Sequence, residues 1–119
     1  MAVFLGFGWK ARIGQLYPSR GLCDYEPQIM APPGVQFLTT RLSFPKARLE
    51  DDAALVNEID VHAQLVADAQ VNLIALNCTA ASMVVGPDEI NRRIEAATGI
   101  RSTTTIEAVM AGIEAARLH

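Results

Sequence analysis

Metal-binding motifs and clusters of basic residues are absent from this sequence. Its two histidines and two cysteines form no CxxC or HExxH pattern, so no metal site is predicted. The ten lysines and arginines form no stripe and the formal net charge is −3, which argues against a nucleic-acid partner. Cys23 and Cys78 could form a disulfide, but in a chain without secretory features we expect two thiols.

Long hydrophobic runs are also missing. The apolar stretch 2–9 is interrupted by Lys10 and Arg12. It is too short to span a membrane and lacks the basic start of a signal peptide, so we expect a cytoplasmic protein without a membrane partner. Half of the residues are hydrophobic and 19% are charged, which is an ordinary globular balance. A chain of 119 residues fits one domain with a real core.

Apolar segments with strand character alternate with segments of helical periodicity. Helices are predicted over 51–69, from Pro87 to a C-terminal turn at Gly99, and from Thr104 onward, where Thr104 and Glu107 have capping-box spacing. Residues 19–33 are expected to be irregular, and His62 and His119 are expected to be solvated. The strands are predicted at 11–17, 35–42, 71–77 and 100–103. This alternation predicts an α/β fold, a flavodoxin-like lobe with a parallel sheet of about four strands flanked by helices.

Cys78 is the main candidate for chemistry. It directly follows the apolar run 71–77, and ligands of open α/β sheets bind beyond the carboxyl ends of the strands. A thiol at a strand end before a helix favours the thiolate form, which could add to an activated double bond or remove a proton beside a carboxylate. The alternative is an inert buried cysteine, which composition alone favours.

Candidate substrate-binding residues follow the predicted strands at the same edge. Ser19 and Arg20 come after the first strand, and the planar fork of an arginine suits a carboxylate. The alternative is that Arg20 is simply a solvated surface arginine. Thr79 and Ser82 follow Cys78 and could donate hydrogen bonds to a substrate, or could simply cap the turn. Thr104 closes the fourth strand, where helix capping is the main expectation and ligand contact a second one.

Three segments together resemble the aspartate/glutamate racemase superfamily, most closely its maleate cis-trans isomerase and arylmalonate decarboxylase branch. The first is Arg12-Ile13-Gly14, followed by Pro18-Ser19 after the first strand. The second is the segment 77–82 (NCTAAS), followed by Gly86. The third is the segment 95–100 (EAATGI), followed by the three threonines 103–105 and by Ala108-Val109. Each motif is short, but their order and spacing match over about residues 11–118.

The resemblance implies a cofactor-independent enzyme with two flavodoxin-like lobes and the active site between them. Racemases of this superfamily use one cysteine from each lobe as opposed acid/base groups. Maleate isomerases use the first-lobe cysteine as a nucleophile on a small dicarboxylate, and a second cysteine assists. By motif position Cys78 is the first-lobe cysteine, with Thr79 and Ser82 in the carboxylate-binding turn. Arylmalonate decarboxylases lack a cysteine there, so Cys78 favours an isomerase or racemase.

The sequence departs from the family pattern at two places. An Asn usually follows Pro-Ser in maleate isomerases, whereas Arg20 and Gly21 stand here, which indicates another anionic substrate or a rearranged loop. We also expect residues 1–119 to form a single lobe without the second one. Three hypotheses follow: half of a two-lobe isomerase or racemase, a stand-alone lobe that forms a homo-oligomer, or a non-catalytic anion-binding module.

Overall fold

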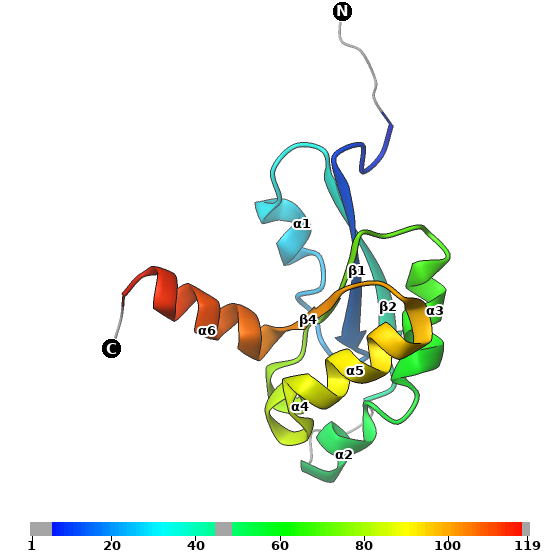
Figure 1. The fold of residues 1–119 in the computed structure, drawn as a ribbon, viewed down its shortest axis with the longest axis vertical. Helices are drawn as coiled ribbons and strands as arrows, with labels where there is room; N and C mark the ends of the chain where they lie inside the picture. Colours follow the sequence, from blue (N-terminus) through cyan, green and yellow to red (C-terminus); the bar gives the residue numbers. More distant parts are fainter. Residues whose placement is uncertain (1–5, 45–48, 118–119) are drawn as a thin grey trace, which may run out of the picture.

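The computed structural model describes residues 6–44 and 49–117 and shows an α/β fold (Figure 1). Its sheet is entirely parallel and has the order β2-β1-β3-β4. This order and the covering helices confirm the predicted fold class. The strands are β1 (Ala11–Pro18), β2 (Val35–Leu42), β3 (Leu73–Leu76) and β4 (Ser102–Thr104).

Helices connect the strands in the expected alternation. The helix α1 follows β1, the pair α2 and α3 follows β2, the pair α4 and α5 follows β3, and α6 follows β4. Pro87 begins α5, and Gly99 ends it in the left-handed conformation with φ 71°, as the sequence predicts. The bounds are α1 (Glu26–Met30), α2 (Leu49–Ala54), α3 (Ile59–Ala67), α4 (Thr79–Val85), α5 (Pro87–Thr98) and α6 (Thr105–Ala115).

The strands predicted at 71–77 and 100–103 differ from the structure at their ends, since β3 is Leu73–Leu76 and β4 is Ser102–Thr104. Two other predicted segments differ more. The helix expected over 51–69 is divided into α2 and α3. Leu55 and Val56 lie in the turn between them and are buried in the core, while the carbonyl oxygen of Val56 accepts a hydrogen bond from Arg93 Nη1 at 3.1 Å. The burial of Leu55 and Val56 and the hydrogen bond from Arg93 take the place of the backbone hydrogen bonds that a continuous helix would make here. The segment 19–33, expected to be irregular, contains α1.

The hydrophobic core lies on one face of the sheet, which we call the covered face. Strand side chains alternate between faces, and the fully buried Leu16, Leu42, Ile74 and Leu76 share this one. Apolar side chains of the helices pack against them. These are Leu55, Val56, Ile59, Ala63, Val66, Ala81, Ile90 and Ile94.

Gly14 of β1 lies close to Val66 of α3. A Cβ atom built at Gly14 would lie 2.8 Å from Val66 Cγ2 and 3.0 Å from Val66 Cβ. Both atoms belong to a stiff β-branched side chain in the core. The absence of a side chain at Gly14 therefore sets how closely α3 packs on the sheet.

We predict that Gly14→Ala destabilises the fold by about 1–3 kcal/mol, because the added methyl group overpacks this contact. The matched variant is Gly112→Ala, since nothing lies within 4 Å of a Cβ at Gly112 in α6. That change should stabilise by up to about 1 kcal/mol through helix propensity. Urea unfolding of both variants tests this, and equal effects would contradict it.

Candidate active site

The carboxyl ends of the four strands meet at one edge of the sheet. Leu16 of β1 pairs with Leu76 of β3, which pairs with Thr104 of β4. The residues that follow these strands therefore emerge next to one another, although the strands are far apart in the sequence. Every predicted site residue lies at this edge or in the first turn of the helix after it.

Cys78 lies between the end of β3 and the start of α4. Its backbone is extended, with φ −152° and ψ 104°, and it is the N-cap residue of α4. The residue is half-buried and packs against the hydrophobic core. The carbonyl oxygen of Cys78 accepts from the Ser82 N–H at 3.0 Å. The thiol is thus held at the sheet edge by a strand before it and a helix after it.

Thr79 and Ser82 occupy the turn that follows the thiol. Thr79 is exposed. Ser82 is fully buried, and its hydroxyl donates to the carbonyl oxygen of Thr79 at 2.8 Å. The structure therefore shows a local role for Ser82 inside α4, and it leaves the Thr79 side chain accessible at the edge.

Ser19 and Arg20 form the loop after β1. The Ser19 N–H donates to the Leu42 carbonyl at 2.7 Å, and the Ser19 hydroxyl oxygen accepts from the Phe44 N–H at 2.9 Å. These bonds attach the loop to the chain that follows β2. Arg20 is exposed.

Arg41, near the end of β2, fixes the same loop from the other side. Its Nη1 donates to the carbonyl oxygens of Ser19 at 2.8 Å and Gly21 at 3.0 Å. Its Nη2 lies 3.0 Å from Asp24 Oδ1, and its guanidinium sits 5.7 Å from the centroid of the Tyr17 ring. Sequence reasoning did not single out Arg41, because only strand pairing brings it to the loop.

A chain of side-chain hydrogen bonds crosses the sheet beneath the site. Gln15 of β1 is 1% exposed. Its Nε2 donates to Thr39 Oγ1 at 2.9 Å and to the Asp24 carbonyl at 2.8 Å. Its Oε1 accepts from Asn77 Nδ2 at 2.8 Å, and Asn77 Oδ1 accepts from the Thr105 hydroxyl at 3.3 Å. Asn77 directly precedes Cys78, so this network orients the end of β3.

Sequence reasoning did not single out Gln15 either. A glutamine inside an apolar strand is a detectable signal, because a buried amide needs several partners. The identity of those partners depends on the sheet register and is not readable from the sequence.

The hydrogen bonds between Thr104 and Glu107 confirm the predicted capping box at the start of α6. The Thr104 hydroxyl donates to Glu107 Oε2 at 2.8 Å, its backbone N–H donates to the same oxygen at 2.8 Å, and the Glu107 N–H donates back at 3.5 Å. Asn91 Nδ2 donates to the same carboxylate at 2.9 and 3.0 Å. Burial raises the pKa of Glu107, but the hydrogen bonds from Asn91 and Thr104 outweigh it and leave the pKa below its usual value.

The two cysteines have different surroundings. Cys23 is exposed in the loop before α1, and its N–H donates to the Tyr17 hydroxyl at 3.1 Å. A hydrogen bond to Glu26 and the charge of that carboxylate raise the pKa of the Cys23 thiol. A thiol that resists ionisation is a weak nucleophile at neutral pH.

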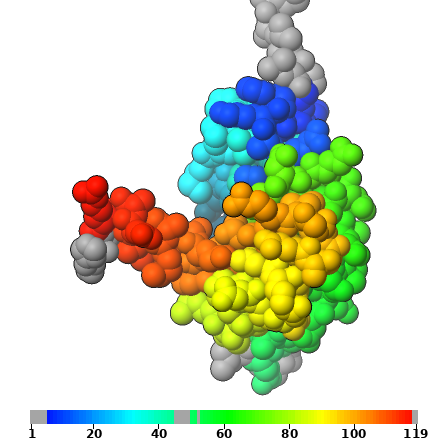
Figure 2. All heavy atoms as spheres, in the orientation of Figure 1, coloured from blue at the N-terminus to red at the C-terminus, as the bar shows by residue number. Residues whose placement is uncertain are grey.

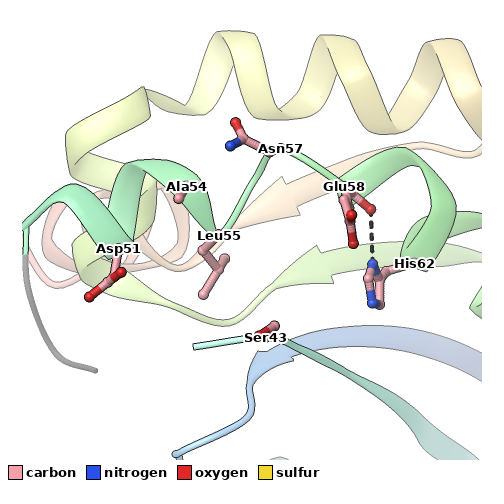
Figure 3. Close-up of a pocket in the computed structure, with 7 residues that line it drawn as sticks. All are labelled: Ser43, Asp51, Ala54, Leu55, Asn57, Glu58 and His62. Carbon is pink, nitrogen blue, oxygen red and sulfur yellow. Dashed lines mark hydrogen bonds between the residues drawn. The ribbon is translucent and has the colours of Figure 1, made fainter. Parts of the chain in front are cut away.

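A pocket of about 340 Å³ lies between α2, α3 and the residues after β2 (Figure 3). His62 Nδ1 lies 2.9 Å from the Glu58 carbonyl oxygen within it. None of the predicted site residues lines this pocket. Its lining consists of Ser43, Asp51, Ala54, Leu55, Asn57, Glu58 and His62.

Across residues 6–44 and 49–117, no group of three His, Cys, Asp or Glu side chains is arranged to hold a metal ion. In the same part of the chain no helix has both the length and the apolar character needed to cross a membrane.

The fold and the site define a flavodoxin-like lobe with a cysteine at the carboxyl edge of its parallel sheet. No protein-family model matches the sequence, and no curated protein matches it significantly. Solved structures do. A liganded variant of arylmalonate decarboxylase has a TM-score of 0.76 and 24% identity, over 89% of this chain and 46% of that one.

Two structures of the maleate cis-trans isomerase of Nocardia farcinica are also similar. One, bound to TRIS, has a TM-score of 0.75 and 24% identity, over 88% of this chain and 48% of that one. The other carries a covalently bound succinylcysteine intermediate and has a TM-score of 0.75 and 21% identity, over the same shares. The chain thus spans about half the length of the structures it resembles, and the resemblance predicted from the motifs is confirmed at the level of fold.

We predict that iodoacetamide alkylates Cys78 faster than Cys23 near pH 7. Exposure alone favours Cys23, so faster labelling of the half-buried Cys78 would demonstrate activation of its thiol. Peptide mass spectrometry of the time course measures both rates in one sample. Cys23→Ser should leave the rate at Cys78 unchanged. A Cys78 rate equal to or below that of Cys23 would show that the thiol is not activated.

The Glu107 network predicts a pH-dependent contribution to stability. Because the folded-state pKa is lowered, this contribution is complete above the unfolded-state pKa of about 4.3 and is lost as the pH falls through the folded-state pKa. Glu107→Gln should cost roughly 1 kcal/mol at pH 7, and its difference from wild type should shrink below about pH 4. Urea unfolding at both pH values measures this. Glu114→Gln, on the exposed part of α6, is the control, and an identical pH response would contradict the prediction.

Proposed function

We propose that this chain is the cysteine-bearing half of a cofactor-independent isomerase of the maleate cis-trans isomerase type, acting on a small dicarboxylate. The position of Cys78 carries the proposal, because the thiol is held at the edge where ligands of such sheets bind. Support comes from the similar Nocardia farcinica structure, which contains a succinylcysteine intermediate.

The chemistry needs a nucleophile that can also leave. The thiolate sulfur of Cys78 bonds to one alkene carbon, the π electron pair moves to the other carbon, and that carbon takes up a proton. Rotation about the resulting single bond brings the carboxylates to opposite sides. Removal of the same proton returns the electron pair, which re-forms the double bond and expels the sulfur. No atom is gained or lost and no oxidant or reductant is consumed.

In this proposal some side chains near Cys78 contact the substrate, and others only hold the backbone around the thiol in place. Within the described part of the chain the exposed Arg20 has no hydrogen-bond partner, so its guanidinium can take a carboxylate. The Ser19 hydroxyl accepts from Phe44 and keeps its own proton for donation. Thr79 is accessible beside the thiol.

Ser82 and Thr104 act indirectly in the same scheme. Their hydroxyl protons are directed to the Thr79 carbonyl and the Glu107 carboxylate, at 2.8 Å in each case. We therefore assign them to holding the turn after Cys78 and the start of α6, and not to direct contact with the substrate.

Turnover requires a second lobe-sized body, in our proposal. Cys23 is the other cysteine of the chain, and the raised pKa of its thiol disfavours it as a partner acid/base. The structures that the chain resembles are about twice as long, since it covers 46–48% of them. A body of similar size would supply the second proton-transfer group and close the site.

An anion-binding lobe without turnover is the second candidate. The observation that favours it is Arg20 in place of the amide expected after Pro-Ser, because a guanidinium binds an anion strongly without contributing to bond making. The two candidates differ in whether sulfur bonds to substrate.

We predict that incubation with maleate adds the mass of one maleic acid to the chain, and that the adduct maps to Cys78. Intact-mass and peptide mass spectrometry measure it, while fumarate formation by the isolated chain should be negligible. Cys23→Ser should retain the adduct and Cys78→Ser should lose it. Binding of maleate without an adduct would select the anion-binding lobe, and rapid fumarate formation would refute the need for a second body.

A further inference from the structure

Asp24 is the residue at which the two polar networks of the site meet. Its Oδ1 lies 3.0 Å from Arg41 Nη2, and its backbone carbonyl accepts from Gln15 Nε2 at 2.8 Å. Arg41 in turn donates to the carbonyl oxygens of Ser19 and Gly21. Asp24 therefore links the loop 19–21, which follows β1, to an amide inside the same strand. The helix α1 begins two residues after Asp24, beside β1 and β2 (Figures 1 and 2).

Gln15 continues the link to the turn that carries the thiol. Its Oε1 accepts from Asn77 Nδ2 at 2.8 Å, and the Asn77 N–H donates to the Leu16 carbonyl at 2.9 Å. Asn77 is thus bonded to β1 through its side chain and through its backbone. Because Cys78 is the next residue and the N-cap of α4, the position of its backbone follows from that of Asn77.

These hydrogen bonds allow only one orientation of the Gln15 amide. A backbone carbonyl can only accept, so the part of the amide that faces Asp24 must be its NH2 group. The oxygen of the same amide then faces Asn77, where it meets the NH2 group of that side chain. Gln15 is 1% exposed, so bulk water does not compete for these groups. The Asp24 carbonyl therefore determines the orientation of both amides.

The two segments that this chain of hydrogen bonds joins are neighbours at the sheet edge. Leu16 pairs with Leu76, and neighbouring strands lie about 4.8 Å apart. Ser19 and Arg20 come directly after β1, and Cys78 follows β3 after one residue. The distance from an anion held by the loop 19–21 to the Cys78 sulfur is thus set by how firmly the loop and the turn are fixed to each other.

We propose that Gln15 and Asp24 are positioning residues, which hold the loop 19–21 and the thiol at one fixed separation. The inference rests on the proposed function, because it takes Ser19 and Arg20 as the groups that bind a carboxylate. Gln15 and Asp24 do not touch the substrate. They hold the backbone segments that carry the guanidinium and the thiol, so that a bound anion presents its reacting carbon to the sulfur. A neutral molecule of the same size gains nothing from this arrangement.

Two alkylating reagents of nearly equal size test the proposal. Iodoacetate and iodoacetamide both bond their methylene carbon to the thiolate sulfur and expel iodide, but only iodoacetate carries a carboxylate. The measured quantity is the ratio of the iodoacetate rate to the iodoacetamide rate at Cys78 in the Cys23→Ser chain. This ratio is divided by the ratio for N-acetylcysteine amide, a neutral model thiol. The pKa and the exposure of the Cys78 thiol affect both reagents and largely cancel.

We expect the relative ratio at Cys78 to be at least about fivefold above that of the model thiol, since a nearby fixed cation concentrates anions. Arg20→Gln should return it to about that of the model thiol, because the cation is then lost. Gln15→Met keeps the length of the side chain but removes the amide. It should lower the ratio at least about threefold, because small misplacements of reacting groups cost large factors in rate.

Gly14→Ala is the matched control for Gln15→Met. Gly14 is the neighbouring residue of β1 and contacts Val66 in the core, so this change should destabilise the fold without touching the network. It should leave the relative ratio unchanged, and far-UV circular dichroism shows which variants are folded. If Gln15→Met does not fold, Asn77→Leu removes the other end of the same hydrogen bond and should lower the ratio to a similar extent.

A relative ratio at Cys78 no higher than that of the model thiol would overturn the proposal. So would a ratio that Gln15→Met leaves unchanged, or one that Gln15→Met and Gly14→Ala lower equally. Failure of the proposed function gives a different result. A raised ratio that Gln15→Met lowers, in a chain that forms no adduct with maleate, would support the positioning role and select the anion-binding lobe.

Discussion

The parallel pairing of β1 with β2 and β3, and of β3 with β4, is the constraint on which the rest of the structure depends. It directs four chain segments to one edge of the sheet, so that Ser19, Cys78 and Thr105 emerge side by side. It also requires helical crossovers between strands. Those crossovers supply α3 and α5, whose apolar faces build the core against Leu16 and Ile74. Site and core are therefore two results of one backbone arrangement.

A site at the edge of a sheet places polar side chains where burial without a hydrogen-bond partner is costly. In this structure those side chains are hydrogen-bonded to one another in connected networks. Gln15 has donors and acceptors matched on both sides, and Arg41 joins three carbonyl or carboxylate oxygens of a single loop. An unsatisfied buried amide would cost on the order of 1–3 kcal/mol. These networks make the positions of Asn77 and the Ser19 loop a consequence of folding, before any ligand is present.

Local signals were enough to predict much of this from the sequence. The β2 bounds, Pro87 and Gly99 at the ends of α5, and the Thr104 capping box all rest on neighbouring residues, and all agree with the structure. The division of the 51–69 helix depended instead on the Val56 carbonyl meeting Arg93, 37 positions away. Arg41 and Gln15 were not predicted as site residues for the same reason, because the register of the strands determines their partners. The placement of Cys78 at the edge was predictable, whereas its neighbours were not.

The one-sided core connects the question of fold to the question of function. A parallel sheet buries both faces in its usual setting, and here the apolar face formed by Ile13, Phe37 and Leu73 is only half covered. The same chain carries a helix, α6, with exposed apolar side chains and no buried residue. Apolar surface without a full layer over it therefore lies on the same lobe that carries Cys78. The second body that our proposal requires for turnover would then concern the packing of this lobe as well as its chemistry.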